Sequence, residues 1–77
     1  MNRKPTLREE QEVFHSIMHI ASIASTCGRD DHLRRIIFAM DDWSYAHRRG
    51  NGEPTERQQQ QMVNHAFWRL KDVVDNP

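Results

Sequence analysis

The sequence has no net charge, no long apolar run and only one cysteine, and each shortage disfavours a class of protein. Eleven basic residues balance eleven acidic ones, so no general attraction draws the chain to nucleic acid or to anionic lipid. No apolar run approaches the roughly 18 residues that a transmembrane helix needs. Cys27 can form no disulfide within the chain and cannot alone hold a zinc ion.

The N-terminal residues lack the apolar core of a signal peptide, because Met1–Pro5 lead directly into a polar, Glu-rich segment. We therefore expect a cytoplasmic protein, and a single cysteine fits a reducing compartment. A chain of 77 residues buries only about 60% of the surface that its unfolded form exposes. We expect one thin-cored domain over residues 1–77, completed by self-association as a homodimer or a larger oligomer.

Helical periodicity dominates the chain, and no segment alternates with period two over a useful length. The sequence therefore predicts an all-α fold, a small antiparallel bundle of three helices over residues 6–26, 30–48 and 55–74.

The predicted helix ends carry recognisable signals. Thr6 and Thr55 are each followed three residues later by Glu9 and Gln58, the spacing of a capping box. Gly28 can adopt the left-handed conformation in which many helices end.

Each predicted helix carries one apolar stripe, which we expect to face the core. The stripe of the first helix comprises Val13, Phe14, Ile17, Met18, Ile20, Ala21 and Ala24. The stripe of the second helix comprises Leu33, Ile36, Ile37, Met40 and Trp43. The stripe of the third helix comprises Met62, Val63, Ala66, Phe67, Leu70, Val73 and Val74.

Three aromatic residues fall outside these stripes. Phe38 and Tyr45 lie seven residues apart on the far side of the second helix, among Arg34, Asp41, Asp42 and Arg49. Trp68 lies on the polar side of the third helix, which also carries Gln61, Asn64, His65 and Asp72. Tryptophan and tyrosine are the residues that most often anchor interfaces. We therefore predict a partner-binding surface made of Trp68, Phe38, Tyr45, Arg34 and Arg49. The alternative for Trp68 is that the apolar side of the third helix is wider and Trp68 packs against another helix or a second copy.

Motifs for catalysis and cofactor binding are missing. His15 and His19 share one helix face, but Ser16 stands where zinc hydrolases need a glutamate, and only a weak site completed by Glu12 is conceivable. Cys27 has no paired base that the sequence can identify. The segment Gly50-Asn51-Gly52 does not have the context of a phosphate-binding loop. We predict no enzyme, no cofactor and no metal site.

Nucleic-acid binding has partial support. Basic residues gather around the second helix at Arg29, Arg34, Arg35, Arg48 and Arg49, and the third helix carries glutamines and an asparagine that can contact base edges. Acidic residues in the same region reduce the positive potential that these arginines create, namely Asp30, Asp31, Asp41 and Asp42. A DNA-associated transcriptional or nucleoid modulator is therefore the alternative rather than the leading hypothesis.

Two resemblances to known families concern the second half of the chain. The first is carried by Cys27, Asp31, Leu33, Arg35, Ile36, Thr55, Glu56, Ala66, Arg69, Leu70 and Asp72. At these positions the sequence resembles the Hha and YmoA group of small helical proteins, which implies a modulator that binds nucleoid-structuring proteins. The second is carried by Phe67, Leu70, Val74 and Pro77, which are similar to the C-terminal pattern of phage proteins that sequester cyclic oligonucleotides.

The combined pattern predicts a small helical protein that acts by occupying another macromolecule's surface. Its size, its neutral charge and its lack of catalytic motifs favour an inhibitor of a bacterial host system, encoded by a phage or a mobile element, of the anti-CRISPR or another anti-defence type. The alternative is the DNA-associated modulator, and the third hypothesis is a protein that sequesters cyclic nucleotides.

Overall fold

The structure is a computed structural model that describes residues 3–28, 30–48 and 55–76, with the side chains of residues 24–27 excepted. Within these ranges it contains three helices and no strand: α1 (Leu7–Cys27), α2 (Asp30–Arg48) and α3 (Glu56–Asp75). Every helix begins and ends within one residue of its predicted bounds. The predicted all-α fold with three helices is confirmed.

Both predicted capping boxes are present. The Thr6 hydroxyl accepts a hydrogen bond from the Glu9 backbone N–H at 3.2 Å, and the Glu9 carboxylate accepts one from the Thr6 N–H at 2.9 Å. Thr55 and Gln58 repeat this arrangement at 3.2 and 2.9 Å. Gly28 follows α1 with a φ of 67°, the left-handed conformation expected from the sequence. These contacts involve near neighbours only, and for that reason they could be predicted.

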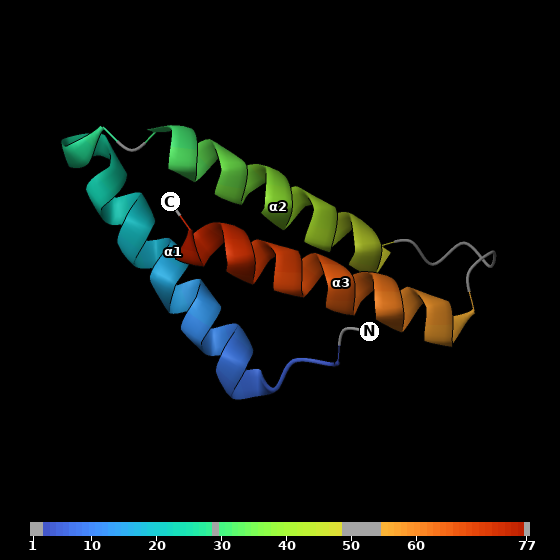
Figure 1. Cartoon of the computed structure of the whole chain (residues 1–77). Coiled ribbons are helices and arrows are strands. Elements are labelled where there is room, and N and C mark those ends of the chain that lie inside the picture. Colours follow the sequence, from blue (N-terminus) through green and yellow to red (C-terminus); the bar gives the residue numbers. More distant parts are fainter. Residues whose placement is uncertain (1–2, 29, 49–54, 77) are drawn as a thin grey trace.

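The three helices form an elongated, open arrangement. α2 and α3 lie side by side and antiparallel, while α1 crosses this pair obliquely (Figure 1). The molecule measures 44 × 23 × 17 Å and has a radius of gyration of 13.5 Å, against about 11.5 Å for a compact domain of this length. An elongated bundle hides less of its apolar surface, and five large apolar side chains remain exposed, namely Leu7, Met18, Ile37, Phe38 and Tyr45. Among the described residues, no helix is long and apolar enough to cross a membrane.

The core lies where α1 crosses the α2–α3 pair. Ile36, Phe67 and Leu70 are completely buried at its centre. Val13 and Ile17 reach this centre from α1. A smaller cluster of Ala46, Val63 and Ala66 extends between α2 and α3, and Trp43 packs against both clusters. The Phe14 ring meets the Trp43 ring edge to face, with centroids 5.5 Å apart, so that α1 is held against α2 by aromatic packing.

Two large residues of the predicted stripes are exposed to solvent. Met18 on α1 is 68% exposed, and Ile37 on α2 is 50% exposed. Both predictions were wrong because α1 crosses the pair at an angle, so only a narrow part of each stripe meets another helix. Ala21 is exposed as well, and the side chain of Ala24 lies outside the described residues.

Two polar side chains of the described residues are buried, and neither was expected to be. Asn64 is only 5% exposed, although the sequence placed it on the polar side of α3. Its carboxamide oxygen accepts a hydrogen bond from Gln60 Nε2 at 2.7 Å, which reduces the cost of burying it. His32 is 4% exposed, and its Nε2 donates to the Val73 carbonyl at 2.8 Å. That carbonyl lies in the last turn of α3, where carbonyls lack partners within the helix. His32 therefore ties the start of α2 to the end of α3.

Candidate functional site

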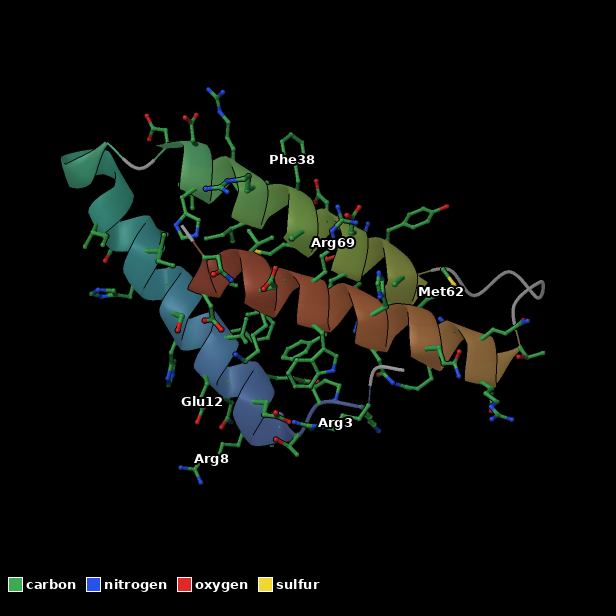
Figure 2. All side chains as sticks on the ribbon, in the orientation of Figure 1. Arg3, Arg8, Glu12, Phe38, Met62 and Arg69 are labelled. Atoms are coloured by element: carbon green, nitrogen blue, oxygen red, sulfur yellow. The ribbon has the colours of Figure 1, made fainter. Side chains whose placement is uncertain are left out.

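The outer side of α2 carries a group of exposed aromatic and charged side chains. We define the α2 face as Arg34, Arg35, Phe38, Asp41, Asp42 and Tyr45, all of them exposed. Phe38 is 67% exposed and Tyr45 is 63% exposed, and Phe38 points away from α3 (Figure 2). The buried residues of α2 are His32, Ile36, Ala39 and Ala46, which lie on the opposite side of the helix. α2 thus packs through one side and presents the α2 face to solvent.

The local sequence explains why α2 is a rigid support for this face. Asp30 and Asp31 lie in its first turn, and His47 and Arg48 lie in its last turn. Acidic groups near the N-terminus and basic groups near the C-terminus both stabilise the helix dipole. Ile36, on the inner side of α2, is completely buried. The helix is thus anchored on the core and holds its outer side chains at helical spacing.

The charged side chains of the α2 face form no ion pair with one another or with other described residues. Among the described residues, the ion pairs are Arg3–Glu9, Arg8–Glu12 and Lys71–Asp75, all located on other parts of the fold. A hollow of about 430 Å³ lies at the C-terminal half of the face, lined by Asp41, Asp42, Ser44, Tyr45 and Arg48. The face therefore offers an apolar ring, unpaired charges of both signs and a depression beside the tyrosine.

Trp68 lies in different surroundings. Its side chain is half-buried and packs against the core, with the Phe67 ring edge-on at 5.1 Å between centroids. Its indole N–H donates to the Arg3 carbonyl at 2.7 Å, and the Arg3 guanidinium lies 4.7 Å from the ring centroid. Of the two placements that the sequence left open for Trp68, the structure has packing against the core, and the segment before α1 folds back over the ring. The part of Trp68 in partner binding stays a prediction.

The segment over Trp68 is held by Glu9. Arg3 forms an ion pair with Glu9, and its Nη1 donates to Glu9 Oε1 at 2.7 Å. Hydrogen bonding to Arg3, followed by the hydrogen bond from the Thr6 backbone, lowers the pKa of Glu9 from 4.5 to about 2. The same contact raises the pKa of Arg3. Figure 2 shows Arg3 beside the start of α1. The Glu9 charge thus helps to keep Arg3 on the indole ring.

We expect the cover over Trp68 to loosen in acid. The pKa of Glu9 is lower in the folded chain than in the unfolded one, so its stabilising contribution is present above pH 4.5 and is lost as the pH falls through about 2. In a Trp43→Phe background, the fluorescence of Trp68 should shift to longer wavelength over this range. Glu9→Gln should show the shifted spectrum already at neutral pH. A spectrum that is identical in both variants at all pH values would contradict the prediction.

The predicted partner-binding residues divide between two locations. Arg34, Phe38 and Tyr45 come together on the α2 face, whereas Trp68 lies on α3 beneath the N-terminal segment. Arg49 lies outside the described residues. Asp41 and Asp42 lie on the same face, as the sequence predicted, although they were not counted among the partner-binding residues. Their place follows from the helical spacing around Phe38, a signal that was available in the sequence.

The two histidines of α1 line a second hollow. It has a volume of about 380 Å³ and is lined by His15, Ser16, His19, Ile20, Val74 and Asp75. Glu12, the carboxylate considered as a third ligand, pairs with Arg8 at 3.4 Å. In the part of the chain that the structure describes, no three histidine, cysteine or acidic side chains are grouped to hold a metal ion.

No protein-family model, no curated protein and no solved structure matches the chain. The resemblances to the Hha and YmoA group and to the phage proteins that sequester cyclic oligonucleotides therefore stay predictions.

Proposed function

We propose that this protein is non-enzymatic and acts by binding another protein through the α2 face, thereby modulating or inhibiting it. One observation carries the proposal: Phe38 and Tyr45 are 67% and 63% exposed and lie two helical turns apart on a helix whose other side is buried. Single exposed apolar residues are common on protein surfaces. Two aromatic rings among charged side chains, on a rigid helix, have the composition of an interface with an apolar centre and a polar rim.

The kind of partner is proposed from the character of the whole chain. A small, neutral helical protein with no recognised catalytic motif needs only one surface in order to block another protein. This favours an inhibitor encoded by a phage or a mobile element and directed at a bacterial host system, of the anti-CRISPR or another anti-defence type. Oligomeric state and partner identity are part of this proposal.

DNA association is the second candidate, because Arg34 and Arg35 are exposed and lie next to each other on the α2 face. Asp41 and Asp42 on the same face lower the local positive potential, which weakens the attraction for phosphates. Retention on DNA that falls steeply with salt concentration, and that is lost in Arg34→Ala/Arg35→Ala, would favour this candidate over protein binding.

We expect Phe38→Ala/Tyr45→Ala to lose its protein partner while keeping its fold. Both side chains are exposed, so each truncation should change the free energy of unfolding by no more than about 0.5 kcal/mol. An aromatic anchor at an interface contributes about 2 kcal/mol or more, or roughly thirtyfold in affinity. The measurement is affinity capture from bacterial lysate with quantitative mass spectrometry, followed by the dissociation constant for the captured protein.

Met18→Ala is the matched control for this experiment. Met18 is as exposed as Phe38, at 68% against 67%, but it lies on α1. It should retain the captured protein. If the double variant captures the same proteins as the unchanged chain, the α2 face is not the binding surface and the proposal fails.

A further inference from the structure

The charges on the α2 face are arranged symmetrically about Phe38. Arg34 and Arg35 precede Phe38 by four and three residues, and Asp41 and Asp42 follow it by three and four residues. At 100° per residue, Arg34 and Asp41 fall on one flank of the Phe38 ring, and Arg35 and Asp42 fall on the other. The face is therefore basic in its N-terminal half and acidic in its C-terminal half, with an exposed aromatic ring at the midpoint.

The charge pattern of the α2 face is complementary to the same face of a second copy that runs in the opposite direction. In two antiparallel helices related by a two-fold axis at Phe38, a residue before position 38 in one copy faces the residue of the same flank that lies about equally far beyond position 38 in the other. Arg34 then faces the partner's Asp41, and Arg35 faces the partner's Asp42. The two Phe38 rings meet on the axis. Each of these contacts occurs twice except the central one, so four ion pairs surround one aromatic pair.

We infer that the α2 face is a docking site for a second copy of this chain, in an antiparallel α2–α2 pair centred on Phe38. The inference rests on the proposed function, since it keeps the α2 face as a protein-binding surface and names the occupant of that face in the free protein. Another protein that binds this face then competes with the second copy.

Several observations fit this occupant. None of the four charged residues forms an ion pair with another described residue of its own chain. The hollow of about 430 Å³ beside Tyr45 is lined by both aspartates, and it lies opposite Arg34 of the second copy in this register. The elongated shape also leaves this face open along α2 (Figure 1).

The charges also select one register. If the helices slid until Phe38 met the partner's Tyr45, Asp41 would face the partner's Asp42, and Arg34 and Arg35 would face a basic stretch that includes Arg48. Like charges placed against each other oppose association. The register centred on Phe38 brings opposite charges together at every flanking position that the face provides.

The experiment is charge reversal followed by mixing. Arg34→Asp/Arg35→Asp makes both halves of the face acidic, and Asp41→Arg/Asp42→Arg makes both halves basic. We expect the unchanged chain to reach twice its 9.2 kDa mass in sedimentation at micromolar or higher concentration, since one helix pair buries less than a standard interface. Each reversed variant should weaken self-association by about a hundredfold or more. An equimolar mixture of the two should form a one-to-one heterodimer.

The fourfold variant Arg34→Asp/Arg35→Asp/Asp41→Arg/Asp42→Arg restores complementarity and should again dimerise. Circular dichroism of every variant checks the fold, and Phe38→Ala provides a separate test that leaves all charges in place. Phe38→Ala should weaken the dimer by about thirtyfold. Raised salt should weaken the dimer of the unchanged chain, because its flanking contacts are ionic.

The possible results separate this inference from the proposed function. A monomeric mass for the unchanged chain at hundreds of micromolar would overturn the self-docking inference, and so would reversed variants that dimerise as well as the unchanged chain does. If a host protein is nevertheless captured through Phe38 and Tyr45, the proposed function stands without the dimer. If the mixed variants pair as expected but no captured protein depends on this face, the inference stands and the proposed function fails.

Discussion

Phe67→Ala should leave most of the chain unfolded at 25 °C. Phe67 is completely buried and lies in the cluster that joins all three helices. Truncating a buried phenylalanine costs about 3–5 kcal/mol, because the lost burial adds to the cost of the cavity left behind. A domain of this size has a total stability of about 4–12 kcal/mol, and its open shape favours the lower part of that range. Far-ultraviolet circular dichroism in a urea series measures the loss directly.

Phe38→Ala is the matched control, since it removes the same side chain from an exposed position on α2. Under conditions that keep the chain monomeric, it should change the free energy of unfolding by no more than about 0.5 kcal/mol. A Phe67→Ala variant whose urea midpoint equals that of Phe38→Ala would show that the cluster around Phe67 does not hold the helices together.

Trp68→Ala should be the second most damaging of the substitutions considered. It removes a large ring that packs against Phe67 and the core. It also removes the hydrogen bond to the Arg3 carbonyl and the stacking of the Arg3 guanidinium. Because the ring is only half-buried, we expect a cost of about 2–3 kcal/mol, below that of a full core truncation. Chemical denaturation followed by circular dichroism gives the value.

Trp68→Phe separates the contribution of ring packing from that of the indole hydrogen bond. It keeps an aromatic ring on the core but has no N–H to donate to Arg3, so it should cost about 1 kcal/mol. If Trp68→Ala instead unfolds at the same urea concentration as the unchanged chain and loses a captured partner, Trp68 is an interface residue, as the sequence predicts. The two outcomes assign the side chain either to the fold or to the binding surface.

The helix ends could be predicted because each is decided by neighbouring residues. Thr6 with Glu9 and Thr55 with Gln58 close their capping boxes within one turn, and Gly28 adopts its positive φ by itself. The outer position of Phe38 and Tyr45 was also predictable, since the period of the helix places them opposite the buried side of α2.

The residues that were misplaced, or whose placement was left open, depend on contacts between distant parts of the chain. Met18 and Ile37 belong to apolar stripes, but the angle at which α1 crosses the pair leaves them in solvent. Trp68 is covered because Arg3 folds back from the other end of the chain. His32 is buried because the Val73 carbonyl lies within its reach. No local pattern encodes a crossing angle or a returning segment, so periodicity alone could not predict these positions.

The oblique position of α1 affects the order in which the protein can be built during synthesis. Val13 and Ile17 lie in one buried cluster with Phe67 and Leu70, which belong to the last helix. The ribosome therefore releases α1 well before the residues that will cover it have been made. During that interval α1 can contact α2, as Phe14 does with Trp43, but the side of α1 that joins Phe67 and Leu70 is open to chaperones or to other nascent chains. Complete burial of the first helix must wait until the third has been synthesised.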